Sequence, residues 1–136
     1  MKLLIFYTTK FSYKTSKKGL DTVDDLEIKE TTENSIVGFI QVEEKDKENS
    51  NYVETKLVKN LKWAARKNET NKIILHSFNH LSNSSAEPNF TLELFNKVEE
   101  RLKNSDYETS QTPFGYFLDI DMQAPGKPLA RIFKEF

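Results

Sequence analysis

Apolar residues gather in three short, nearly continuous runs that predict buried strands. They cover residues 3–8, 36–42 and 72–76. Such runs are typical of strands covered on both faces, whereas a strand with one wet face alternates apolar and polar residues. Clear alternation occurs once, with apolar side chains at every second position from Phe114 to Met122. That pattern predicts another strand late in the chain.

Two segments repeat apolar residues at the spacing of an amphipathic helix. The first covers residues 52–67, and the second begins near Pro88, which suits a first helical turn, and ends near Asn104. Weaker patterns predict short strands at residues 11–14, 26–28, 107–112 and 129–133, and loops at 17–34 and 43–50. Together these elements predict a single α/β (α+β layered) domain with a mixed β-sheet and two main amphipathic helices.

Composition narrows the class of protein. A length of 136 residues suits one domain, and the absence of cysteine excludes disulfides and thiolate metal sites. No stretch approaches the ~18–20 apolar residues that span a bilayer, and no signal-peptide pattern opens the chain, so we expect a cytoplasmic protein. With 20 Lys and Arg against 21 Asp and Glu, the chain is not basic. Binding to a nucleic acid would therefore need a local positive patch or another source of affinity.

Two segments could carry chemistry. In the first, a buried strand runs into the polar loop 77–85, which contains His80. Loops at strand ends often hold binding groups, although Ser and Asn are common in any loop and His80 could simply cap the next helix. His76 and His80 lack a nearby third ligand, so we expect no metal site.

In the second segment, Pro113 restricts Thr112 to extended geometry, and Gly115 allows a ligand to approach the main chain closely. A ligand could hydrogen-bond to main-chain groups there. The alternative is a bend entering a strand, with its aromatic residues in the core.

In this order and separation, the two segments resemble the editing domain of archaeal threonyl-tRNA synthetase. That family has Phe-x-His-Leu-Ser after a short strand, then a helix, Pro-Phe-Gly-Tyr, and a Gly-x-Pro-Leu-Ala turn into a strand. The resemblance covers nearly the whole chain, includes the strand at 39–43, and is weakest over residues 12–34. The matching residues are Phe78, His80, Leu81, Ser82, Pro113, Phe114, Gly115, Tyr116, Gly126, Pro128, Leu129 and Ala130.

The resemblance implies a D-aminoacyl-tRNA deacylase-like fold, with an aminoacyl-tRNA editing domain over residues 1–136 as an N-terminal part of a longer synthetase. The implied activity is proofreading hydrolysis of L-seryl-tRNA(Thr), which releases serine and spares threonyl-tRNA(Thr), without a cofactor. The implied partners are the 3′ end of tRNA(Thr) carrying serine, a second copy in a homodimer, and the remainder of the synthetase.

For the site, the resemblance implies that Val42 helps form a wall that clashes with the methyl group of threonine. His80 would lie beside the seryl or adenosine group, and residues 114–117 would form another wall. His80 is the candidate to accept the proton of water, because histidine titrates near neutrality; the 2′-hydroxyl of the terminal adenosine could organise the water instead. The implied substrate-binding residues are Val42, Phe78, Asn79, Pro113, Phe114, Gly115, Tyr116 and Phe117.

Two positions depart from the family pattern. Leu118 stands where the family carries lysine, and Arg131 stands where it carries glutamate. Main-chain groups and the RNA hydroxyl would preserve activity without those side chains, and we expect activity because Phe78, His80 and Gly115 are intact. The alternatives are a catalytically silent module that positions tRNA or dimerises, and a D-aminoacyl-tRNA deacylase, whose Ser-Gln-x-Thr and Gly-Pro signatures are absent.

Overall fold

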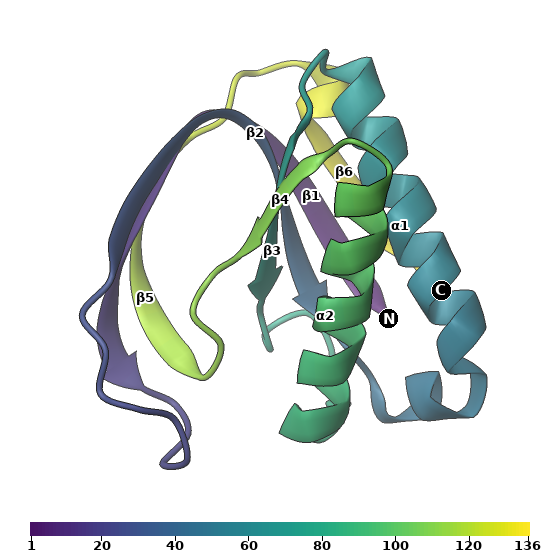
Figure 1. Cartoon of the computed structure of the whole chain (residues 1–136). Helices are drawn as coiled ribbons and strands as arrows, with labels where there is room; N and C mark the ends of the chain where they lie inside the picture. Colours follow the sequence, from purple (N-terminus) through teal and green to yellow (C-terminus); the bar gives the residue numbers. More distant parts are fainter.

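The computed structural model describes residues 1–136 and contains a six-stranded sheet with two α-helices (Figure 1). The helices are α1 (Ser50–Lys67) and α2 (Pro88–Asn104), and two short 3-10 segments are η1 (Glu44–Asn49) and η2 (Pro128–Ala130). The strands are β1 (Lys2–Lys18), β2 (Lys29–Gln41), β3 (Lys72–Ser77), β4 (Glu108–Gln111), β5 (Tyr116–Gln123) and β6 (Arg131–Glu135). The structure therefore confirms a single α/β domain with a mixed sheet and two helices.

Strand β1 organises the sheet. It pairs antiparallel with β2 along one side, and on its other side with β6 over residues 2–6 and with β5 over residues 10–18. The β2–β3 and β3–β4 pairs are parallel. The resulting order is β4-β3-β2-β1-β5, with β6 beside the first part of β1.

Both helices pack on one face of the sheet and enclose the main core (Figure 1). Each helix presents its apolar stripe to the strands, as the predicted 3.6-residue repeat requires. Leu57 and Leu61 of α1 and Phe95 of α2 are almost completely buried against strand residues such as Leu3 and Ile40. Neither helix is long and apolar enough to cross a membrane.

The sheet curls, so its other face surrounds a second, smaller apolar cluster (Figure 1). This cluster contains Phe11, Val37, Phe39 and Ile74. Only residues 112–115 join β4 at one edge of the sheet to β5 at the other. This short connection links the two edges of the curled sheet next to the end of β3.

Several predicted boundaries were wrong. The predicted strands at 3–8 and 11–14 are one strand, β1, which continues to Lys18. The loop predicted over 17–34 is therefore shorter and ends at residue 28, before β2 begins at Lys29. No strand forms at residues 26–28, and the loop predicted at 43–50 contains η1. The last strand begins at Arg131, because η2 takes residues 128–130. The polar parts of β1 and β2 become strands because they pair with other strands of the sheet. A local sequence pattern contains no information about such partners.

Candidate active site

A cavity of about 390 Å³ lies where the end of β3 meets the β4–β5 connection and the start of α2. Both candidate segments line it, although more than 30 positions separate them in the sequence (36 between His76 and Thr112, which are in contact). The volume falls within the ~300–1,000 Å³ of typical ligand pockets. The lining residues are Gly19, Leu20, His76, Ser77, Phe78, Asn79, His80, Ala86, Pro88, Thr91, Pro113, Phe114, Gly115, Tyr116, Phe117, Leu118 and Ile120.

Aromatic rings connect the cavity to the smaller apolar cluster. The ring of Phe39 lies 5.0 Å from His76 and 5.1 Å from Phe78, and Phe78 lies 4.9 Å from His80, all edge to face. His76 is buried on β3, whereas His80 is exposed in the loop that follows. The two histidines therefore occupy different depths of one site.

Burial decides the charge of His76. Its Nδ1 lies 2.9 Å from the hydroxyl of Thr112, and burial lowers the pKa of its imidazole to about 4. At neutral pH this ring is uncharged and offers one donor and one acceptor rather than a positive charge. From the sequence, His76 was expected only as a possible metal ligand, and its place in the cavity was not predicted. Its position at the end of an apolar strand, two residues before Phe78, was the available signal.

The lowered pKa of His76 predicts acid sensitivity. Since the unfolded histidine binds a proton below about pH 6.5 and the folded one only near pH 4, stability should be complete above pH 6.5 and fall as the pH drops between these values. Between pH 7 and 5 this single group should cost about 2 kcal/mol of unfolding free energy. Urea unfolding of the wild type and His76→Gln at both pH values measures the cost as the difference between their pH slopes. The exposed His80→Gln is the control, and equal slopes for the wild type and His76→Gln would refute the prediction.

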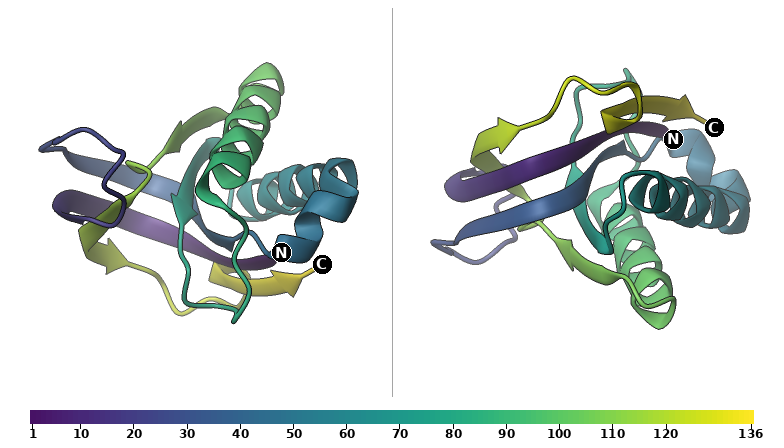
Figure 2. Two further views of the ribbon diagram at one scale, coloured as in Figure 1. Left: turned by 90° about the horizontal axis from the view of Figure 1, so that it is seen from below. Right: turned by 90° about the horizontal axis from the view of Figure 1, so that it is seen from above.

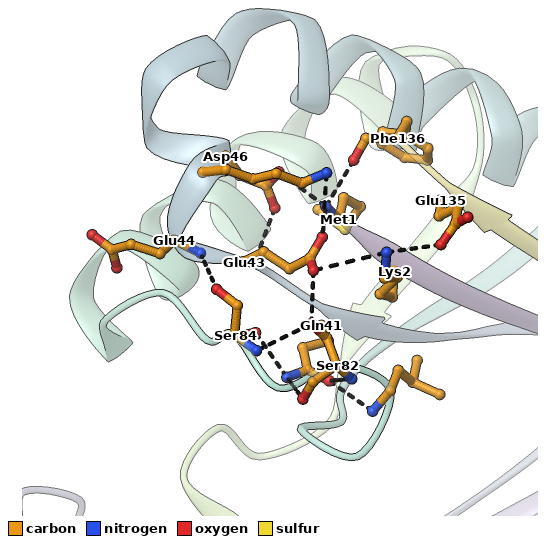
Figure 3. A network of polar contacts seen from close by, with 12 residues as sticks. Met1, Lys2, Gln41, Glu43, Glu44, Asp46, Ser82, Ser84, Glu135 and Phe136 are labelled. Carbon is orange, nitrogen blue, oxygen red and sulfur yellow. Dashed lines mark hydrogen bonds and ion pairs between the residues drawn. The ribbon is translucent and has the colours of Figure 1, made fainter.

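The side chain of Gln41 holds the loop that carries His80 (Figure 3). Its Oε1 accepts hydrogen bonds from the main-chain N–H groups of Leu81 and Ser82, both at 2.7 Å. Its Nε2 lies 3.0 Å from the carbonyl oxygens of Ser82 and Ser84 and from the hydroxyl of Ser85. Only 1% of Gln41 is exposed, so water cannot replace these bonds. Sequence reasoning missed this anchor, although a glutamine inside an apolar run was its signal.

Glu43 extends the same network toward the first residue (Figure 3). Its carboxylate accepts hydrogen bonds from the Ser82 hydroxyl at 2.7 Å and from the Met1 ammonium at 2.6 Å. The ammonium also donates to Asp46 at 2.9 Å and to the carbonyl oxygen of Phe136 at 2.8 Å. Burial alone would raise the pKa of Glu43, but the hydrogen bonds from Met1 and Ser82, with the nearby positive charges, lower it. This charged cluster thus holds the loop through the hydrogen bond between Ser82 and Glu43.

The β4–β5 connection forms a second part of the cavity wall. Gly115 has a φ of +87°, and a Cβ there would lie 2.8 Å from Cγ1 of Val23, so only glycine fits without strain. Its carbonyl oxygen accepts hydrogen bonds from the N–H groups of Gly19 and Leu20, at 2.6 and 3.2 Å. This carbonyl is therefore already engaged, and a ligand must use other main-chain groups of the wall.

One polar atom in the cavity lining has no partner within the chain. The hydroxyl of Tyr116 is buried without a hydrogen-bond partner in the chain. Buried polar atoms are rarely left unpaired, so this hydroxyl is available to a ligand or to water. Leu118 lines the cavity, whereas Arg131 does not and reaches the carbonyl oxygen of Ala124 at 3.4 Å. Of the two departures from the family pattern, only Leu118 therefore changes the cavity wall.

The structure brings together every predicted site residue except Val42. Phe78, Asn79 and His80 line the same cavity as residues 113–117. Val42 is instead buried in the main core, and its contact with the site is a main-chain bond from the N–H of Ala86 to its carbonyl oxygen, at 2.8 Å. Side chains alternate along an extended chain, so Val42 and Gln41 point in opposite directions. The side chain of Val42 therefore does not form the cavity wall that the resemblance implied.

A curled mixed sheet with a cavity at the end of a parallel strand defines a small α/β domain with a candidate ligand site. The family described as the archaea-specific editing domain of threonyl-tRNA synthetase matches residues 1–136, so this chain belongs to that family. The match confirms the resemblance drawn from the sequence motifs.

Curated relatives agree with this assignment. The chain is 30% identical over 135 residues to threonine–tRNA ligase of Thermococcus kodakarensis and 27% identical over 133 residues to that of Methanopyrus kandleri, with 97% of the chain covered in both. It spans only 22% and 21% of their lengths. Among solved structures, the c-Myc DNA Unwinding Element Binding Protein shares the fold with a TM-score of 0.66 at 15% identity, covering 100% of this chain and 99% of that one.

Proposed function

We propose that the chain hydrolyses the ester bond of mischarged L-seryl-tRNA(Thr) and spares threonyl-tRNA(Thr). The observation that carries this proposal is the convergence of the His80 loop and the Pro113 segment on one cavity in a member of an editing-domain family. Because the chain spans about a fifth of its relatives' length, we propose that it acts as part of a longer synthetase.

The need for a second site is energetic. A site that attaches threonine to tRNA cannot strongly reject serine, because one methyl group contributes only ~1–3 kcal/mol of binding free energy. A cavity that admits serine and clashes with the extra methyl group supplies the missing discrimination. Since Val42 lies in the core, we assign that clash to apolar side chains that do line the cavity, such as Leu118 and Ile120.

The chemistry is attack of water on the ester carbonyl carbon. The tetrahedral intermediate collapses by breaking the bond to the ribose oxygen, which takes a proton and leaves as a hydroxyl, while serine is released as its carboxylate. His80, exposed at the loop beside Phe78, is our candidate to accept the proton of water. Neutral His76 and the free hydroxyl of Tyr116 are placed to hydrogen-bond to the bound aminoacyl group. Leu118 transfers no proton, so the 2′-hydroxyl of the RNA is the alternative organiser of the water.

A deacylation assay tests the proposal. The chain should release serine from seryl-tRNA(Thr) well above the spontaneous rate and leave threonyl-tRNA(Thr) intact; equal release of both amino acids would reject the selectivity. His80→Ala should lower the rate about 100-fold, the lower range for loss of a general base. The matched control is Asn83→Ala, an exposed change in the same loop, which should keep the rate. A full rate in His80→Ala would transfer the proton-accepting role to the RNA or water.

A silent tRNA-positioning module is the second candidate, favoured by Leu118 in the cavity wall. It predicts tRNA binding with no release of serine above the spontaneous rate. The same assay therefore separates the two functions.

A further inference from the structure

Five cationic side chains line one open groove between α1 and β6, and none of them lines the cavity. The groove has a volume of about 650 Å³ and no carboxylate in its lining. None of its cations forms an ion pair within 4.0 Å, although other lysines of this chain are paired. The groove is lined by Lys56, Lys59, Asn60, Lys62, Trp63, Arg66 and Lys134. Unpaired like charges repel each other, so this groove is suited to an anion.

The helix sets the shape of the charged surface. Four of the cations follow one another on α1 at intervals of three or four residues, which places them along one side of the helix. The ten positions from Lys56 to Arg66 span about 15 Å. Lys134 adds a charge from β6, where it pairs with Leu3, whose side chain belongs to the main core. Trp63 is partly buried against that core and gives the groove an aromatic surface.

We propose that this groove binds the phosphodiester backbone of an RNA. A small anion would engage one or two of the cations, whereas a row about 15 Å long matches successive phosphates of a strand. Trp63 can pack against a base or a ribose, as aromatic side chains do in sites for single-stranded nucleic acid. The chain has a net charge of −1, so this groove supplies the local positive patch that RNA binding requires. The inference rests on the proposed function only for the identity of the RNA, the tRNA whose 3′ end would enter the cavity.

Binding of tRNA(Thr) without an attached amino acid to two variants of equal net charge tests the inference. The groove variant carries Lys59→Gln and Arg66→Gln, and the control carries Lys29→Gln and Lys97→Gln. All four positions are exposed and form no ion pair, and both variants lose two positive charges, so their net charge is matched. Fluorescence anisotropy of labelled tRNA should be measured for each at several salt concentrations.

The groove variant should bind about tenfold more weakly, and the slope of log K against log salt should fall by about 0.7–0.9 for each phosphate that the variant no longer neutralises. The control should keep the affinity of the wild type. Equal weakening of both variants would reduce the effect to net charge and overturn the inference, and so would unchanged affinity of the groove variant, which would leave the groove to an acidic protein partner. Because this tRNA carries no amino acid, the result does not depend on hydrolysis. Selective weakening of the groove variant, together with an absent deacylase activity, would reject only the proposed function.

Discussion

Replacing Gln41 by alanine should lower the free energy of unfolding by about 3 kcal/mol, because it leaves several buried polar groups of the His80 loop without partners. The N–H groups of Leu81 and Ser82 would lose the acceptor that both share, and the carbonyl oxygens of Ser82 and Ser84 would lose their donor. Each unsatisfied buried group costs ~1–3 kcal/mol, partly recovered if the loop moves into water. Deacylation should fall with stability, since the loop would no longer hold His80 at the cavity.

Hydrogen exchange distinguishes this local effect from general weakening. In Gln41→Ala the amides of Leu81 and Ser82, which donate to Gln41, should exchange faster, while those in the centre of α1 stay protected at low denaturant. The control is Gln123→Ala, since that side chain is exposed and should change stability by less than about 0.5 kcal/mol. If the loop amides of Gln41→Ala remain as protected as in the wild type, the side chain is not the anchor that we describe.

Replacing Glu43 by glutamine should cost about 3 kcal/mol, because removal of one partner leaves a buried charge poorly compensated. The Met1 ammonium has no exposed surface and would keep only Asp46 as a counter-charge. The hydroxyl of Ser82 would lose a charged acceptor at the same time. Chemical denaturation at pH 7 measures the loss. The adjacent Glu44→Gln is the matched control, since its ion pair with Lys47 is exposed and should contribute less than about 1 kcal/mol.

The pH dependence gives this prediction a second test. The pKa of Glu43 is lower in the folded chain than in the unfolded one, so its contribution is complete above the ordinary pKa of glutamate and is lost as the pH falls through the folded value. The stability difference between the wild type and Glu43→Gln should therefore shrink in acid. A difference that persists unchanged below that range would show that packing, not charge, explains the loss.

Local patterns correctly predicted the elements whose own apolar side chains contribute to the core. Strand β3 and helix α2 lie within a residue or two of their predicted bounds, because each apolar run or stripe is complete within the element. The second half of β1 is mostly polar, and its extended shape comes from pairing with β2 and β5. No pattern within about ten residues contains that information.

The candidate site divides in the same way. Motif order correctly placed His80 and residues 113–117 on one cavity, since the resemblance carried information on the tertiary fold. The anchors Gln41 and Glu43 were missed. A polar side chain in a buried strand indicates that it has hydrogen-bond partners, but not which residues they are. Val42 lies outside this cavity for a geometric reason: side chains alternate between the two faces along a strand, and that of Val42 lies in the main core.

The pairing of β1 has a consequence for how the chain reaches this fold. Residues 2–6 pair with β6, so Lys2 lies opposite Glu135, and the two chain ends lie side by side (Figure 2). During synthesis this part of β1 leaves the ribosome well before β6, since Glu135 follows Lys2 by 133 positions, and its edge stays uncovered in the meantime. Contacts between residues so far apart in sequence slow folding relative to domains whose contacts are mostly local. Until β6 arrives, the apolar first half of β1 has an open edge, and this is the interval in which the nascent chain is most exposed to aggregation.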